Sequence, residues 1–77
     1  MTIEALRRFA KAAPFRPFLI HLADGRTIPV VHHDYIISSP SGRTAIVYQP
    51  DDSFEVIDLL LVASLHVKPK RAAQNRK

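Results

Sequence analysis

Three short turn signals, each flanked by alternating apolar and polar residues, constrain the fold of this chain more than any other feature of its sequence. They lie at residues 23–26, 39–43 and 49–52 and combine Gly, Pro, Ser and Asp, the residue types that favour tight turns. Between them, apolar residues recur at every second position, as in strands with one buried face. The sequence therefore predicts three consecutive β-hairpins.

Loop length determines which face of each strand points inward, because side chains alternate between the two faces. We expect loops at residues 23–25, 40–42 and 50–51, the last of which places Val47 opposite Phe54. These registers bring one face of every strand into a shared interior. The predicted core consists of Phe18, Ile20, Ile28, Val30, Ile37, Val47, Phe54 and Val56.

Helical segments are predicted on both sides of the hairpins. Residues 3–13 carry apolar side chains at a 3.6-residue period, Thr2 is suited to the N-cap, and Pro14 disfavours continuation of the helix. Asp58 is expected to cap a single helical turn over residues 59–61. A last strand then closes the domain.

This order of elements predicts a mainly β fold, in which an N-terminal helix precedes a five-stranded antiparallel meander that curls into a small SH3-like or Sm-like barrel. Residues 1–68 form the single domain, with the meander over 18–68, and residues 69–77 form a basic tail that we expect to be disordered. The chain has 77 residues and no cysteine, so we expect no second domain, disulfide framework or thiol nucleophile.

The net charge of +4 is unevenly distributed, because both ends are basic and the middle is acidic. No charged-then-apolar leader opens the chain, and the longest apolar runs are too short to span a bilayer. We therefore expect a cytoplasmic protein that makes no use of a membrane.

Four segments share features with a known group of small barrels: Ala5-Leu6-Arg7-Arg8, the strand and turn from Ile20 to Gly25, Asp34-Tyr35-Ile36, and Val62-Ala63-Ser64-Leu65. Over residues 5–68 the chain resembles the Sm-like family, and particularly its bacterial host-factor RNA chaperone. The resemblance implies the barrel fold. That chaperone contacts RNA through a Tyr-Lys-His run beside its fourth strand. The comparable stretch of this chain, residues 57–60, has no basic side chain, so no RNA-contact residue is carried over. Residues 14–18, 24–26 and 54–60 also resemble very short bacterial proteins of unassigned function, which implies no activity.

The densest set of metal-ligand types is His32, His33 and Asp34. Successive strand residues point to opposite faces, so His32 and His33 are expected not to bind one ion without a bulge. We predict no metal and no cofactor, and the sequence leaves open whether these three residues bind a metal.

Serines 38, 39 and 41, together with His33 and Asp34, supply the residue types of a hydrolytic triad. Serine is common in turns because its hydroxyl can hydrogen-bond to the nearby backbone, which explains these serines more simply. A domain this small also has few residues to form both a pocket and the side chains that hold catalytic groups in place. The chain is therefore predicted to be non-enzymatic, with no small-molecule substrate.

The leading functional prediction is protein–protein interaction, including self-association into a homo-oligomer. It rests on aliphatic residues expected to point outward, since a contiguous exposed apolar patch usually marks an interface. The predicted interface residues are Leu19, Val31, Ile36, Ile46 and Ile57.

The alternative prediction is an electrostatic RNA or DNA binder without sequence preference, using the helix and the basic tail. No aromatic residue interleaves with the tail, so base stacking is not expected. The predicted contacts are Arg7, Arg8, Lys11, Arg16, Lys68, Lys70 and Arg71.

Overall fold

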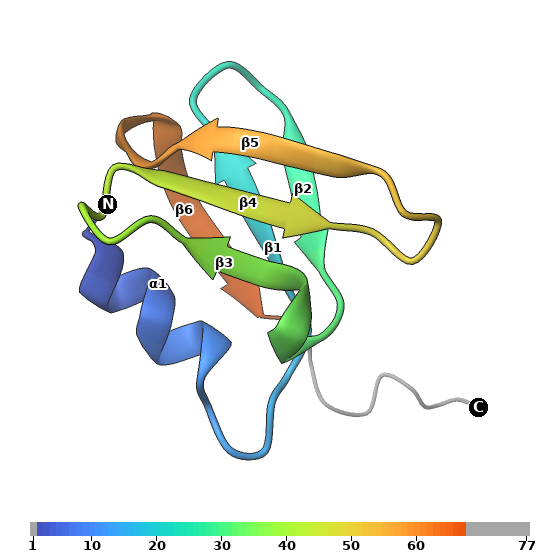
Figure 1. The fold of residues 1–77 in the computed structure, drawn as a ribbon. Coiled ribbons are helices and arrows are strands. Elements are labelled where there is room, and N and C mark those ends of the chain that lie inside the picture. Colours follow the sequence, from blue (N-terminus) through green and yellow to red (C-terminus); the bar gives the residue numbers. More distant parts are fainter. Residues whose placement is uncertain (1, 68–77) are drawn as a thin grey trace.

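The computed structural model describes residues 2–67, which form one N-terminal helix and six strands in two antiparallel sheets (Figure 1). In chain order the elements are α1 (Ile3–Ala10), β1 (Phe18–Leu22), β2 (Thr27–Val30), the 3₁₀ turn η1 (His33–Tyr35), β3 (Ile36–Ser38), β4 (Thr44–Tyr48), β5 (Phe54–Asp58), the 3₁₀ turn η2 (Leu59–Leu61) and β6 (Val62–Val67). The sheets have the strand orders β2-β1-β6 and β3-β4-β5. The predicted mainly β class with an N-terminal helix is confirmed.

The prediction of five strands in one curled sheet is wrong. The turn η1 separates β2 from β3, and these two strands belong to different sheets. Within residues 2–67 the strands therefore form two three-stranded sheets and no closed barrel.

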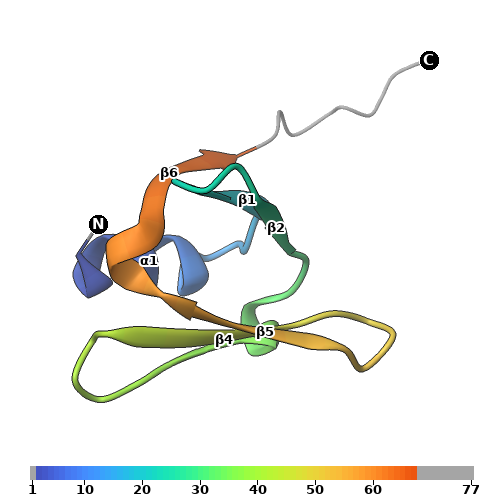
Figure 2. The same ribbon diagram turned by 90° about the horizontal axis from the view of Figure 1, so that it is seen from above.

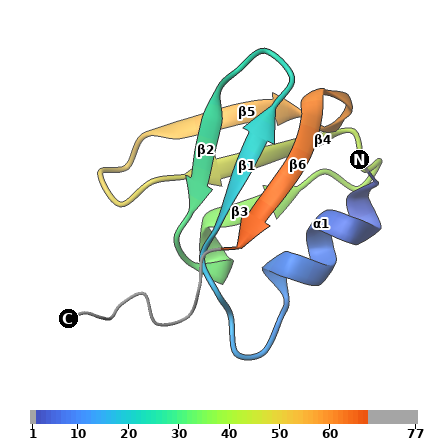
Figure 3. The same ribbon diagram turned by 180° about the vertical axis from the view of Figure 1, so that it is seen from behind.

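The two sheets are stacked as layers, and α1 fills the open side between β6 and β3 (Figures 2 and 3). Both sheets, α1 and η2 contribute to one hydrophobic core. The buried core residues are Leu6, Phe18, Ile20, Leu22, Ile28, Val30, Ala45, Val47, Ile57, Leu59 and Val62.

The helix begins as predicted, because the Thr2 hydroxyl accepts a hydrogen bond from the Ala5 backbone N–H at 3.2 Å. It ends at Ala10, three residues earlier than expected. The chain beyond α1 turns back so that the Phe15 ring packs 6.1 Å from the ring of Phe18 in the core. At the helix end the Lys11 N–H donates to the Arg7 carbonyl at 2.9 Å, and the next N–H, of Ala12, bonds to Phe9 in a tighter i→i−3 turn instead of continuing the helix.

The first hairpin is confirmed in loop and register. Gly25 has φ +95°, in the left-handed region that a side chain disfavours. Phe18 lies opposite Val30 and Ile20 opposite Ile28, and all four side chains are buried.

The second hairpin differs from the prediction by one residue. Its loop has four residues instead of three, because the hydrogen-bonded pair that closes it joins the Ser39 N–H to the Thr44 carbonyl at 2.8 Å. A shift of one residue exchanges the two faces of a strand. Ile37, predicted in the core, is therefore 54% exposed, whereas Ile36, predicted at the interface, packs inward against the core.

The third hairpin also has a longer loop than expected. Asp52 adopts φ +79°, which adds a third loop residue after 50–51. Phe54 and Val56, both predicted in the core, are consequently 57% exposed. Ile57, predicted at the interface, is 1% exposed and belongs to the core.

The turn η2 connects the two sheets and forms as predicted. The Asp58 carboxylate accepts a hydrogen bond from the Leu60 N–H at 2.9 Å, and Leu59 is buried in the core. None of the helical segments within residues 2–67 has the length and apolar character needed to cross a lipid bilayer.

Candidate functional site

The outer face of the β3-β4-β5 sheet carries an uninterrupted apolar row. Ile37 of β3 lies directly opposite Ile46 of β4, and Ile46 lies directly opposite Val56 of β5. Ile37 and Val56 are 54% and 57% exposed, and Ile46 is half-buried between them. We call Ile37, Ile46 and Val56 the apolar row.

An aromatic pair flanks the apolar row. Tyr48 lies opposite Phe54, and their ring centroids are 5.5 Å apart. On the other flank, Thr44 lies opposite Asp58. Among residues 2–67 the outer face therefore has an apolar centre, with the carboxylate of Asp58 at its margin.

The outer face of the β2-β1-β6 sheet has a different character. Around Leu19 it carries mainly polar side chains: His21, Thr27, Ser64 and His66. The His21 and His66 rings lie 6.3 Å apart, and the His21 ring is within 3.2 Å of the Thr27 hydroxyl. The two sheets share one core but present different chemistry to their surroundings.

Among the predicted interface residues, only Ile46 lies on the apolar row. Leu19 is half-buried on the other sheet, Val31 is exposed in the connection after β2, and the inward positions of Ile36 and Ile57 are described above. The prediction missed Ile37 and Val56. A three-residue loop at 50–52, with Asp in the left-handed position that Asp tolerates, would have placed Val56 outward.

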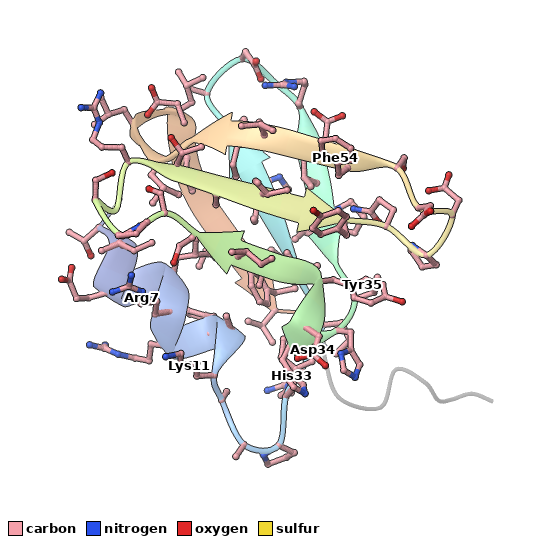
Figure 4. The ribbon with its side chains drawn as sticks, in the orientation of Figure 1. Arg7, Lys11, His33, Asp34, Tyr35 and Phe54 are labelled. Carbon is pink, nitrogen blue, oxygen red and sulfur yellow. The ribbon has the colours of Figure 1, made fainter. Side chains whose placement is uncertain are left out.

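A groove separates the C-terminal half of α1 from β3. It has a volume of about 820 Å³ and continues past the segment after the helix to η1. Its lining is Leu6, Arg7, Ala10, Lys11, Ala12, Ala13, Pro14, Phe15, His33, Asp34, Ile36, Ile37 and Ser38. Arg7 and Lys11 lie along the helix, and His33 and Asp34 lie at the end of the groove beside η1 (Figure 4).

The cluster of His32, His33 and Asp34 is closer together than a strand would allow. These residues lie at and within η1, and their potential ligand atoms are all within 4.8 Å of one another. The two imidazole rings stack with centroids 4.5 Å apart. The expectation that His32 and His33 point to opposite faces is therefore wrong, because the backbone here is a 3₁₀ turn.

Hydrogen bonding within the cluster already uses the Nδ1 atoms that face Asp34. His32 Nδ1 accepts from the Asp34 backbone N–H at 3.2 Å, and His33 Nδ1 lies 3.1 Å from a carboxylate oxygen of Asp34. All three side chains are exposed. His32 thereby caps η1, and whether the cluster binds a metal stays a prediction.

The serines near η1 serve the chain's own turns. Ser39 Oγ accepts from the Thr44 N–H at 3.2 Å and lies 3.1 Å from Ser41 Oγ. Ser38 Oγ accepts from Arg7 Nε at 3.4 Å. Within residues 2–67, no hydrogen bond joins any of these serines to His33, so the structure does not assemble the triad that their residue types suggested.

The predicted nucleic-acid contacts fall into two groups. Arg7, Arg8 and Lys11 lie on or directly after α1, and Arg16 lies in the link to β1. The other predicted contacts, Lys68, Lys70 and Arg71, lie outside the described residues, as does the predicted tail.

No family model, curated protein or solved structure matches this chain. The resemblances to Sm-like chaperones and to short bacterial proteins therefore stay predictions.

Proposed function

We propose that this protein is a small, non-enzymatic interaction domain that self-associates through the outer face of its β3-β4-β5 sheet. The observation that carries the proposal is the apolar row, in which Ile37, Ile46 and Val56 are in register across all three strands. Single exposed aliphatic residues are common on monomers, whereas contiguous apolar patches typically mark contacts. We further propose that the two sheets are an open variant of the SH3-like or Sm-like arrangement.

The symmetry of the row favours a second copy as the occupant. A two-fold axis that lies in the interface along β4 places Ile46 against Ile46, and Ile37 of one copy against Val56 of the other. A patch that meets itself in this way forms a closed dimer. The absence of charge at the centre of the face, with Asp58 only at its margin, matches the composition of interface cores.

The size of the face sets the expected affinity. β4 and β5 have five residues each and β3 has three. Their outer face is therefore at most roughly 17 Å long and 14 Å wide, which is small compared with the roughly 800 Å² that each partner buries in a typical stable interface. Tyr48 and Phe54 extend the apolar surface. We therefore expect reversible dimers with dissociation constants on the order of 10–100 µM.

Sedimentation velocity over a range of concentrations tests the proposal. The weight-average sedimentation coefficient of the wild type should rise with concentration, and Val56→Glu should remain monomeric because it buries a charge at the symmetric contact. Val31→Glu is the matched control, since Val31 is 39% exposed and lies outside the β3-β4-β5 sheet. A wild type that stays monomeric at several hundred micromolar, or equal effects of both variants, would refute self-association through this face.

The second candidate function is electrostatic binding of RNA or DNA. It is favoured by Arg7, Arg8 and Lys11, none of which forms an ion pair with a carboxylate among residues 2–67. Binding should weaken steeply with salt and fall when residues 69–77 are deleted. Salt-independent or absent binding would remove this candidate.

A further inference from the structure

We propose that the groove between α1 and β3 binds an extended acidic peptide of another protein, which adds as a strand to the free edge of β3. This site shares Ile37 with the apolar row, but it lies along the edge of β3 and does not depend on self-association. Three features support it: a free strand edge, a channel beside it, and positive charge along one side.

The free edge follows from the hydrogen-bond pattern of β3. In antiparallel pairs, bonded and non-bonded residues alternate along a strand. Ser39 bonds to Thr44, so Ile37 is the next residue of β3 that bonds to β4. The backbone N–H and C=O groups of Ile36 and Ser38 therefore point away from β4, and within residues 2–67 no other group hydrogen-bonds to them.

No backbone hydrogen bond joins α1 to this edge among residues 2–67. The helix lies across the groove from β3, and the direct polar link between them is the 3.4 Å contact of Arg7 Nε with Ser38 Oγ. A contact of that length is weak and is readily exchanged for another acceptor. The volume of about 820 Å³ lies within the range of binding pockets, and Leu6, Phe15 and Ile36 supply an apolar lining for alternate side chains of a peptide.

Charge selects the peptide. Arg7 and Lys11 are four residues apart, which places them on one face of the helical turn, and both line the groove. Neither has a carboxylate partner among the described residues. The negative charge of Asp34 lies at the η1 end of the groove, beside His33 at 3.1 Å. The acidic residues of the peptide are therefore expected beside Arg7 and Lys11.

A protein ligand fits these features better than a nucleic acid does. The exposed backbone groups of Ile36 and Ser38 match the donor and acceptor spacing of another strand. A phosphodiester backbone carries no N–H donors, so it does not match the alternating donors and acceptors of this edge. An oligonucleotide is therefore included in the test as the competing ligand.

The probe is a fluorescein-labelled ten-residue peptide of alternating Glu and Val, measured by fluorescence anisotropy with the full-length protein. Lys11→Glu should weaken its binding about tenfold, because it places a carboxylate beside the acidic residues. Arg8→Glu is the matched control, since it makes the same charge change three residues before Lys11 but Arg8 does not line the groove. It should weaken binding by less than about threefold, as expected for a long-range charge effect.

Strand addition is tested separately with the wild-type protein, so that no variant needs to fold. A peptide N-methylated at alternate Val residues cannot donate to the β3 edge and should lose binding. In hydrogen exchange followed by NMR, the amides of Ile36 and Ser38 should become protected when the unmodified peptide is added.

Several results would overturn the proposal. These are no binding of the Glu-Val peptide at millimolar concentration, equal effects of the Lys11 and Arg8 variants, or full binding of the N-methylated peptide. A single-stranded DNA decamer that binds with the same dependence on Lys11, without protection of Ile36 and Ser38, would assign the groove to nucleic acid instead. Failure of self-association would leave all of these readouts unchanged.

Discussion

Two glycines occupy left-handed turn positions, but only one of them touches another element. Gly42 has φ +76°, and a Cβ added there would lie 3.0 Å from Cγ2 of Ile3 in α1. Gly25 has φ +95°, and a Cβ added there would meet no atom within 4 Å. Gly42 therefore combines a backbone requirement with a packing requirement, whereas Gly25 has only the first.

We predict that Gly25→Ala lowers the free energy of unfolding by about 1 kcal/mol, the cost of a left-handed alanine. Gly42→Ala should cost about 2–3 kcal/mol, because Ile3 must also move. Urea denaturation of the two variants measures the difference. Equal losses of stability would show that α1 does not pack against this loop.

Two aspartates in turns have lowered pKa values. The hydrogen bond from the Arg26 backbone N–H, at 3.1 Å, is the main cause for Asp24, and the Arg26 side chain adds to it. For Asp51 the main cause is the Ser53 hydroxyl at 2.6 Å, followed by the Ser53 backbone N–H at 3.0 Å. Each carboxylate stabilises its loop in the ionised form.

A lowered carboxyl pKa makes folding stability depend on pH in one direction. The stabilisation is fully present above the unfolded pKa of about 3.9 and is lost as pH falls through the folded value. The melting temperature of the wild type should therefore fall on acidification below about pH 4, and a variant carrying Asp24→Asn and Asp51→Asn should lose part of this decrease. Thermal melts over this range test it, and an equally steep decrease in the double variant would contradict the assignment.

At the scale of the element, strand β5 depends on the length of the loop before it. In the observed register Ile57 is 1% exposed and Val56 is 57% exposed. Ile57→Ala should cost about 2–4 kcal/mol of unfolding free energy, since it leaves a cavity in the core. Val56→Ala should cost less than about 1 kcal/mol, as expected for an exposed position. Chemical denaturation of both variants distinguishes the registers. A larger loss of stability for Val56→Ala than for Ile57→Ala would support the register predicted from the alternation instead.

At the scale of the whole molecule, α1 is attached to the sheets largely through Leu6. This residue is 1% exposed and is the fully buried residue of the helix, where it joins the core between the two sheets. A domain of this size has a total stability of roughly 4–12 kcal/mol, so the contact is a sizeable part of it.

We predict that Leu6→Ala lowers the unfolding free energy by about 2–5 kcal/mol. Because α1 forms one side of the groove, the variant should also bind the Glu-Val peptide more weakly under conditions in which it remains folded. Arg8→Ala is the control and should change stability by less than about 0.5 kcal/mol. A folded Leu6→Ala protein with an unchanged groove affinity would show that α1 does not shape the site.

Local chemistry along the chain determined the elements themselves. The Thr2 and Asp58 caps and the left-handed Gly25 depend only on neighbours within a few residues, so their predictions are confirmed. The alternation of apolar residues likewise indicated strands and a mainly β class. Each of these features is short-range, and a short-range rule is sufficient to predict it.

Tertiary structure decided the registers, the division into two sheets and both candidate surfaces. The left-handed Asp52 lengthens the loop before β5 and so exchanges the inward and outward faces of that strand. The turn η1 separates β2 from β3, which the alternation had predicted to share one sheet. One loop residue more or less barely changes the local free energy of a turn, yet it moves every following side chain to the opposite face. The choice is therefore made by the packing of the whole core, where burying Ile57 instead of Val56 determines which side chains are left on the surface to bind a partner.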